Sequence, residues 1–228
     1  MTAGSYTDAA TGIKLKTWAA TEGAPYTFGM ALPSDALTKD ATEYIGLLVC
    51  EHHPCISLGG NSLTPLQRCT ISNATSPGYC GLSHGQSGQM TQALLLVAWA
   101  NEGTVYTSFR YATGYTLPGV YTGNAKLTQI SSNVTATSFE LLYRCENCFA
   151  WNQDGTDASV STAAGNLVLG RAAGKQGLVN PTCPDKATFG FHDNGFGQWG
   201  APLEGVAQAD YAKWAALAKT VPKTTCDE

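Results

Sequence analysis

Hydrophobic and polar residues alternate along much of this chain in short runs, which is the pattern of half-buried β-strands. Glycine, proline and asparagine lie between the runs and favour turns there. The predicted strands cover residues 13–18, 26–31, 43–48, 93–100, 104–111, 125–130, 138–144 and 166–169. Many short strands joined by turns predict an all-β chain that folds as an antiparallel, immunoglobulin-like β-sandwich.

One strand departs from this alternation. Residues 93–100 are continuously apolar, which predicts a strand that is buried on both faces. Asn101-Glu-Gly103 follows it, and Thr104 opens the next alternating run. Because glycine favours a tight reversal, this order predicts a hairpin with a three-residue loop.

A single helix is predicted near the C-terminal end, over residues 208–219. Tyr211, Trp214 and Ala218 fall on one stripe of it, and Lys219 lies in its last turn, where a cation is favourable. We expect this short helix to pack on one end of the sandwich.

Size and charge limit the classes of protein that this chain can represent. It has 228 residues and a net charge of −4. We expect a single domain over residues 1–228, large enough to admit a cofactor, and a monomer. The negative charge argues against a nucleic-acid partner. The longest apolar run, 93–100, is far shorter than the ~20 residues of a membrane helix, so we expect no membrane partner either.

Eight cysteines at uneven spacing predict an oxidising, extracellular compartment and a secreted glycoprotein. The sequons Asn73-Ala-Thr75 and Asn133-Val-Thr135 agree with this. Met1 precedes a polar stretch rather than a signal peptide, so we expect that a leader has been removed. The turn-like tail after the helix is expected to mark a domain cut from a longer protein.

Several motifs with known chemistry have a simpler structural interpretation. Cys145-Glu-Asn-Cys148 follows a strand, which favours a local disulfide, and Phe149 excludes covalent haem attachment. Cys50-Glu-His-His-Pro-Cys55 has the residue types of a zinc site but lies in a stretch without periodicity. Scattered carboxylates do not predict the spacing that glycoside hydrolysis needs, and we interpret them as solvated turns and strand ends: Asp40, Glu43, Glu140, Asp154 and Asp157.

Two segments remain as candidates for a cofactor. One is the polar loop 83–90, which ends on Met90, and the other is the glycine- and aromatic-rich segment 189–200, which contains His192. Glycines let backbone approach a flat ligand, and aromatic rings, here Phe191, Phe196 and Trp199, can pack against it. Methionine and histidine together are an axial pair for haem iron. With two methionines besides Met1 and four histidines, composition alone leaves eight such pairs open.

Longer segments resemble a known family, the cytochrome domain of cellobiose dehydrogenase, an extracellular fungal haemoflavoenzyme. The similarity runs from Tyr6 to about Cys226. It is carried by Met90-Thr-Gln-Ala-Leu-Leu-Leu-Val-Ala-Trp99, Ser108-Phe-Arg-Tyr-Ala-Thr-Gly-Tyr115, Arg144-Cys-Glu-Asn-Cys148 and Thr188-Phe-Gly-Phe-His192, in the family's order.

The resemblance implies that Met90 and His192 bind the iron of haem b and that Tyr115 contacts a haem propionate. Arg110 lies five residues before Tyr115, and we add it as a second candidate for a carboxylate. The alternative for Arg110 is a place on the solvent face of its strand. The second ring N–H of His192 is expected to be donated to Asp193 or to a backbone carbonyl.

Two protein ligands leave no open iron position, so the resemblance implies one-electron transfer without substrate turnover by this domain. It further implies that electrons come from a flavin dehydrogenase domain, which would hold FAD outside this chain. They would leave for a copper-dependent lytic polysaccharide monooxygenase. The alternatives are a carbohydrate-binding β-sandwich that uses exposed Trp and Tyr, and a structural domain without a ligand.

One segment departs from the family. The family's strand ending in Leu-Leu continues almost directly into Arg-Cys, so residues 49–67 are an apparent insertion. Its length keeps the reading frame and equals that of a short fungal intron. A codon for Val49 can begin with GT, and Gln67 can be encoded by CAG, so we hypothesise a retained intron. Without the insertion, proximity and resemblance favour the disulfides Cys69–Cys80, Cys145–Cys148 and Cys183–Cys226.

Overall fold

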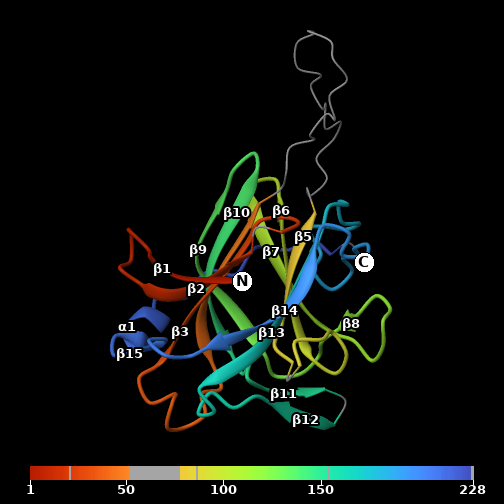
Figure 1. The fold of residues 1–228 in the computed structure, drawn as a ribbon. Coiled ribbons are helices and arrows are strands. Elements are labelled where there is room, and N and C mark those ends of the chain that lie inside the picture. Colours follow the sequence, from red (N-terminus) through yellow and green to blue (C-terminus); the bar gives the residue numbers. More distant parts are fainter. Residues whose placement is uncertain (21, 52–77, 86, 154, 227–228) are drawn as a thin grey trace, which may run out of the picture.

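The computed structural model describes residues 1–20, 22–51, 78–85, 87–153 and 155–226. Two sheets face each other as a sandwich, with a small hairpin beside them (Figure 1). The all-β, antiparallel prediction is confirmed. The predicted insertion 49–67 lies outside these ranges from residue 52 on, and so do Cys55, Cys69 and the first sequon.

The first sheet has the order β1-β2-β3-β4-β10-β9, and β15 pairs with β3 in parallel. Its neighbours along this path are otherwise antiparallel. The bounds are β1 Thr2–Thr7, β2 Lys14–Ala20, β3 Tyr26–Pro33, β4 Tyr44–Glu51, β9 Lys126–Val134, β10 Ser138–Glu146 and β15 Ala207–Gln208.

The second sheet has the order β14-β13-β5-β6-β7-β8 and is antiparallel throughout. The bounds are β5 Tyr79–Ser83, β6 Leu94–Asn101, β7 Thr104–Tyr111, β8 Gly119–Val120, β13 Asn166–Gly174 and β14 Phe196–Pro202. The separate hairpin pairs β11 (Ala150–Gln153) with β12 (Thr156–Ser159).

The strand predicted to be buried on both faces is confirmed as β6, in which every residue is buried. Its hairpin differs from the prediction, because Asn101 pairs with Thr104 and only Glu102 and Gly103 form the loop. Both loop residues have positive φ, at 48° and 78°. This is the geometry of a type I′ turn, whose twist matches that of the flanking strands.

Sheet alternation separates the two faces of the second sheet. Leu82, Leu96 and Leu169 point inward into the main core between the sheets. Gly81, Val97 and Ala172, on the same three strands, lie on the outer face and do not belong to this core. Because successive side chains of a strand alternate in direction, each of these strands supplies side chains to the core on one face and to the outer surface of the sheet on the other.

The helix α1 covers only Tyr211–Ala215, and its expected position on one end of the sandwich is wrong. Tyr211 and Trp214 pack with Ile45 and Leu142 on the outer face of the first sheet. That face is apolar at these positions and would otherwise meet water, so burial of the helix stripe there is favourable. No helix in the part of the chain that the structure describes is long and apolar enough to cross a bilayer.

Two of the three disulfides suggested by the resemblance are confirmed, Cys145–Cys148 and Cys183–Cys226. The third pair, Cys69–Cys80, was predicted for a chain without the insertion and stays a prediction; in this structure, which keeps the insertion, Cys80 bonds to Cys50. Cys50 lies on β4, which continues three residues beyond Leu48. Cys80 lies on β5 in the other sheet, so this bond joins the two sheets. Three disulfides agree with an oxidising compartment.

Candidate cofactor site

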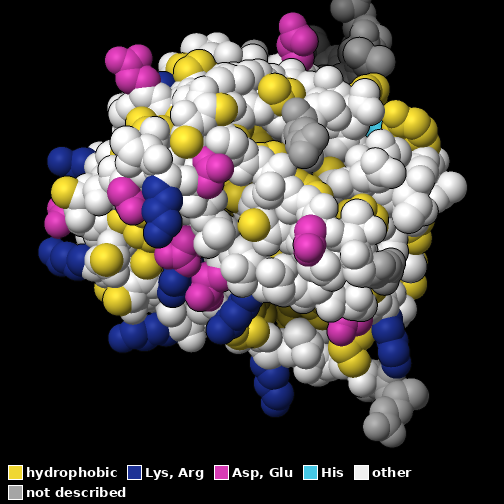
Figure 2. Space-filling model, turned by 90° about the horizontal axis from the view of Figure 1, so that it is seen from below, with side chains coloured by type: hydrophobic (Ala, Val, Ile, Leu, Met, Phe, Trp, Pro, Cys, Tyr) yellow, Lys and Arg dark blue, Asp and Glu magenta, His cyan; other side chains and the backbone are white. Residues whose placement is uncertain are grey.

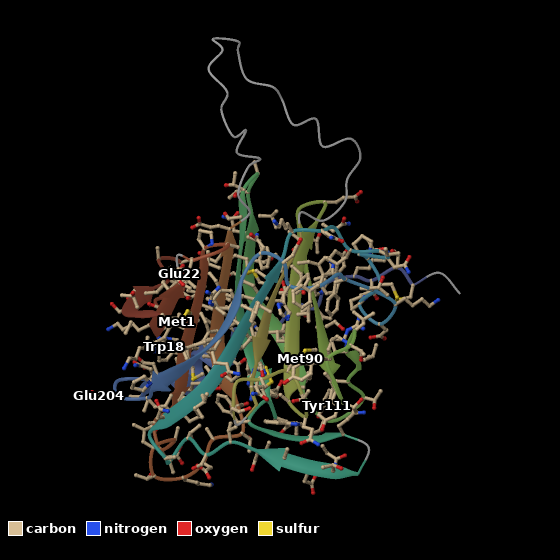
Figure 3. The ribbon with its side chains drawn as sticks, turned by 45° about the vertical axis from the view of Figure 1, so that its right-hand side comes forward. Met1, Trp18, Glu22, Met90, Tyr111 and Glu204 are labelled. Carbon is tan, nitrogen blue, oxygen red and sulfur yellow. A yellow bond between two sulfur atoms is a disulfide. The ribbon has the colours of Figure 1, made fainter. Side chains whose placement is uncertain are left out.

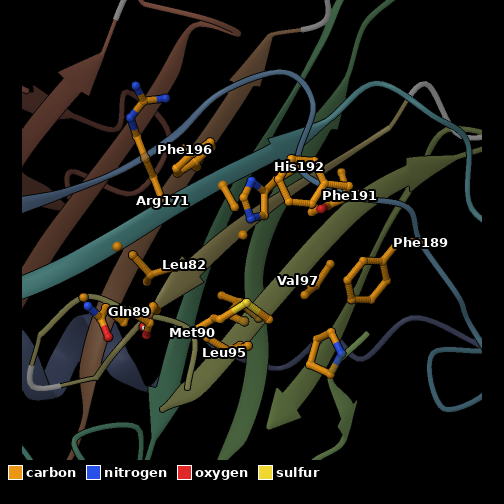
Figure 4. A pocket seen from close by; sticks show the side chains of 18 of the residues that line it. Leu82, Gln89, Met90, Leu95, Val97, Arg171, Phe189, Phe191, His192 and Phe196 are labelled. Carbon is orange, nitrogen blue, oxygen red and sulfur yellow. The ribbon is translucent and has the colours of Figure 1, made fainter. Parts of the chain in front are cut away.

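A cavity of about 820 Å³ lies on the outer face of the second sheet, of a size typical of cofactor sites. Strands β5, β6 and β13 provide its floor, and loop residues 88–90, 115–118 and 189–192 enclose it. Met90, Tyr115 and His192 all line it. The structure therefore brings together three of the four predicted site residues, which come from three separate loops. Figure 4 shows two of them, Met90 and His192.

The floor of the cavity is made by small residues. Gly81, Gly170, Ala172 and Val97 line it from three adjacent strands. A Cβ atom added to Gly81 would come no closer than 3.6 Å to any protein atom, so the protein itself does not require glycine at this position for space. Glycine inside a strand often marks the close approach of a ligand. A flat group can lie against this floor.

Met90 reaches the cavity from a loop that is held against β13 by two glycines. A Cβ on Gly170 would collide with the Gly88 carbonyl oxygen, and Gly88 has φ of 69°. Only glycine permits this backbone-to-backbone contact. The Ser83 hydroxyl also donates a hydrogen bond of 2.5 Å to the Gln89 carbonyl. These contacts fix the loop immediately before Met90, whose side chain is half-buried.

His192 enters the same cavity from the opposite side (Figure 4). Its ring packs against Phe191 and Phe196, at centroid distances of 4.0 Å and 4.5 Å. Its Nδ1 is buried and has no hydrogen-bond partner. The expected bond to Asp193 or a carbonyl is therefore not made; Asp193 Oδ1 instead accepts a bond from the Lys175 amide.

The rim of the cavity is apolar and open to solvent. Tyr115 is 78% exposed, and Phe191 and Phe196 are 69% and 62% exposed. Trp199, which the sequence placed with these rings, points into the core and is buried. Charged side chains crowd the α1 and β15 side of the molecule, whereas the opposite side is largely uncharged in the view from below (Figure 2).

Arg110 does not line the cavity. It is 4% exposed and donates to the Pro184 and Ala187 carbonyls at 2.6 Å and 2.7 Å. Its guanidinium also lies 5.5 Å from the centre of the Phe189 ring. Burial lowers the pKa of this guanidinium. The alternative of a solvent-facing Arg110 is also wrong, because its contacts hold the segment that leads into His192.

Apart from the exposed Met1, the remaining described methionine and histidine lie in the core. Met30 and His84 are both fully buried and do not line the cavity. Figure 3 shows Met90 on the side of the second sheet, far from Trp18 on the first. Of the Met–His pairs within the described residues, only Met90 and His192 therefore share the cavity. His52 and His53 lie outside those residues.

Sequence reasoning missed Gly81, Gly170 and the floor that they form. The sequence did contain a signal for this floor. Both glycines lie inside strands, where glycine is unfavourable and often marks the close approach of a ligand or of another backbone segment. Strand β5 itself was not predicted, because its five residues alternate too briefly. The donor set, the flat floor and the half-buried thioether together fit a haem group.

Comparison with known proteins agrees with this geometry. The model of a family described as the cytochrome domain of cellobiose dehydrogenase matches residues 6–213. The solved cytochrome domain of Myriococcum thermophilum cellobiose dehydrogenase is 42% identical, with a TM-score of 0.82 over 96% of this chain and 97% of that chain.

Two further relatives come from Coprinopsis cinerea. The cytochrome b domain of its pyranose dehydrogenase has a TM-score of 0.70 at 20% identity, over 99% of this chain and 100% of that chain, and so shares the fold. A pyrroloquinoline quinone-dependent pyranose dehydrogenase is 33% identical over 118 residues. That match covers 51% of this chain, which spans only 15% of the relative.

Proposed function

Because this chain belongs to the family of cellobiose dehydrogenase cytochrome domains, which are electron-transfer modules, we propose that it binds haem b through Met90 and His192. The observation that carries the proposal is their position on opposite sides of one cavity, which no other described Met–His pair shares. When bound, haem supplies a reversible one-electron couple of its iron.

The residues of the site would tune this couple in different ways. A thioether ligand favours the reduced iron and raises its reduction potential. Phe191 and Phe196 both pack against the His192 ring and limit its rotation. The buried Nδ1 of His192 has no protein partner, so the ring keeps a nitrogen that is available to the iron.

Tyr115 would contact a propionate of the bound haem from the rim. Its side chain is exposed and lines the cavity, so its hydroxyl is available to donate a hydrogen bond to a carboxylate. Arg110 is not included in this proposal, because its Nε and Nη2 donors already bind Ser108 and two carbonyls.

The domain would act as a secreted relay. Its family and its relatives place such domains in multidomain dehydrogenases, so we propose a dehydrogenase partner that delivers electrons one at a time. A flavin domain fits the cellobiose dehydrogenase relatives, and a quinone-dependent domain fits the pyranose dehydrogenase relative. We further propose a copper-dependent lytic polysaccharide monooxygenase as acceptor.

The test is visible spectroscopy of the protein expressed with haem. We expect a low-spin Soret band that shifts on reduction by dithionite. Met90→Leu should convert it to a high-spin form, because leucine keeps the volume but removes the sulfur ligand. Met30→Leu is the matched control and should leave the band unchanged, since Met30 is buried in the core. A Met90→Leu protein with an unaltered low-spin band would refute the assignment.

A further inference from the structure

The core contains a hydrogen-bonded group of polar rings that the haem proposal does not use. The Tyr44 hydroxyl lies 2.6 Å from His84 Nε2 and 3.2 Å from the Tyr143 hydroxyl. All three side chains are fully buried. Tyr44 and Tyr143 belong to the first sheet, and His84 follows β5 of the second, so the group crosses the sandwich.

The directions of these bonds follow from the partners of His84. Its Nδ1 lies 3.0 Å from the Leu94 carbonyl, which can only accept, so Nδ1 carries the proton. Burial lowers the pKa of His84 to about 4, and the ring is therefore neutral near pH 7. Nε2 is then a bare acceptor, and the Tyr44 hydroxyl donates to it. Tyr143 is left to donate to the Tyr44 oxygen.

We propose that Tyr44 and His84 form a proton-coupled, one-electron redox site in the core of this domain. Tyr44 gives one electron to a strong one-electron oxidant, and its phenol proton moves along the 2.6 Å hydrogen bond to His84 Nε2. The products are a neutral Tyr44 radical, a His84 imidazolium and the reduced oxidant. A one-electron reductant outside the core reverses the step by electron transfer through the protein, and the proton returns to the phenol oxygen.

The surroundings suit this chemistry. A phenol is hard to oxidise unless its proton can leave, because the phenol radical cation is a much stronger acid than an imidazolium. The proton therefore moves to His84 even though burial disfavours the charged ring. His84 is a positioned base of the kind that assists proton transfer. Tyr143 donates to the oxygen on which the radical density would form, and the Phe149 ring stacks on Tyr44 at 4.9 Å. Burial excludes small reductants and should lengthen the radical's lifetime.

The position of the pair connects it to the cavity. Ser83 and Leu95 line the cavity, and they are the chain neighbours of His84 and of its partner Leu94. Tyr44 is therefore separated from the proposed haem site by one layer of β-sheet. A strong one-electron oxidant at the cavity would therefore find Tyr44 nearby as an electron donor, and Tyr44 can be reduced again afterwards.

A metal site is a weaker interpretation of the same residues. His84 lies within 4.8 Å of the sulfurs of Cys145 and Cys148, a set of atoms that could bind a soft metal ion. Those sulfurs form a disulfide, so neither is a thiolate. Both nitrogens of His84 also already have hydrogen-bond partners.

The experiment is flash oxidation of the ferric, haem-loaded protein by photogenerated ruthenium(III) polypyridyl, followed by freeze-quench electron paramagnetic resonance. We expect a long-lived tyrosyl signal in the unmodified protein and its loss in Tyr44→Phe. His84→Leu should slow formation of the radical by roughly 100-fold, which is a typical contribution of a positioned base. Formation should also be slower in D₂O.

Two tyrosine variants serve as controls. Tyr143→Phe removes the second hydroxyl and should retain the long-lived signal. Tyr6→Phe removes a partly exposed tyrosine that bonds to Glu140 at 3.1 Å, and it should also retain it. A long-lived signal in Tyr44→Phe, an unchanged rate in His84→Leu, or no D₂O effect would each overturn the proposal.

If Tyr44→Phe does not fold, the rate in His84→Leu still decides, because the hydrogen bonds of the His84 ring are made to Tyr44 and to the Leu94 carbonyl. The oxidation of Tyr44 does not require haem, so the radical measurement and the visible spectrum report on the two proposals separately.

Discussion

The core and the cavity of this domain each hold one methionine and one histidine. Met30 and His84 are fully buried between the sheets, and both nitrogens of His84 are bonded. Met90 is half-buried at the cavity, and His192 has a buried nitrogen without a partner. The same residue types therefore differ in whether they still have an atom free to bind a ligand. A side chain whose donors and acceptors are already used serves the fold, and one with free capacity can serve a ligand.

The largest difference between the two histidines should appear when each is replaced. We expect His192→Ala to lose low-spin haem completely, because no other described histidine lines the cavity. The unfolding free energy of the haem-free protein should change little. His84→Gln should do the opposite, with low-spin haem retained and stability reduced by about 1–3 kcal/mol, the cost of an unsatisfied buried hydrogen-bonding group. Visible spectra measure the low-spin haem, and urea unfolding measures the free energy of unfolding. Equal haem loss in the two variants would contradict the comparison.

Filling the floor of the cavity should be nearly as damaging. We expect Gly81→Leu to lose most bound haem, because the leucine would project into space that no protein atom occupies within 3.6 Å of its Cβ. The fold should persist, since no protein contact is broken. Gly119→Leu is the control, with its nearest protein atom at 3.8 Å and a position outside the cavity. The haem-to-protein absorbance ratio gives the answer, and full haem content in Gly81→Leu would show that the group does not lie on this floor.

The buried histidine should make stability depend on pH. The pKa of His84 is lowered to about 4 in the fold, mainly by burial, from 6.5 when it is free. Between these values the unfolded chain binds more protons than the folded chain, so stability rises with pH. This contribution is complete above pH 6.5 and is lost as the pH falls toward 4.

Urea unfolding at pH 7.5 and pH 4.5 should therefore show a difference that is smaller in His84→Gln than in the parent by roughly 2 kcal/mol. An equal pH dependence in both proteins would mean that folding does not lower the pKa of His84.

The smallest expected effect concerns the segment 49–67, whose removal tests the retained-intron hypothesis. Joining Leu48 to Arg68 places Cys69 two residues after Leu48, the position that Cys50 now holds on β4. We expect the shortened protein to keep its haem spectrum and its stability, with Cys69 bonded to Cys80, because the strand and its disulfide are both restored. Peptide mapping without reduction identifies that bond. The transcript is an independent check, and one that encodes all of 49–67 would refute the intron hypothesis.

Predictions from the sequence succeeded where local pattern decides structure. All eight predicted strands are present, and β7 has the predicted bounds. Strands β5 and β14 were missed, because β5 is very short and β14 is rich in glycine. They exist because neighbouring strands supply their hydrogen bonds, and no local signal encodes that pairing. The helix was predicted too long and on the wrong surface, since its packing depends on an apolar sheet face distant in the chain.

In the site, too, local chemistry was predictable and tertiary contacts were not. The residues themselves, together with the resemblance, singled out Met90 and His192, because thioether and imidazole are chemically suited to iron wherever they lie. The sequence could not show that Arg110 folds inward onto two carbonyls or that Cys80 bonds to Cys50.

The sequence alone therefore determined the fold class and the chemical types available. Only the tertiary structure decided which histidine remains free, because burial and hydrogen bonding are properties of neighbours brought together by folding.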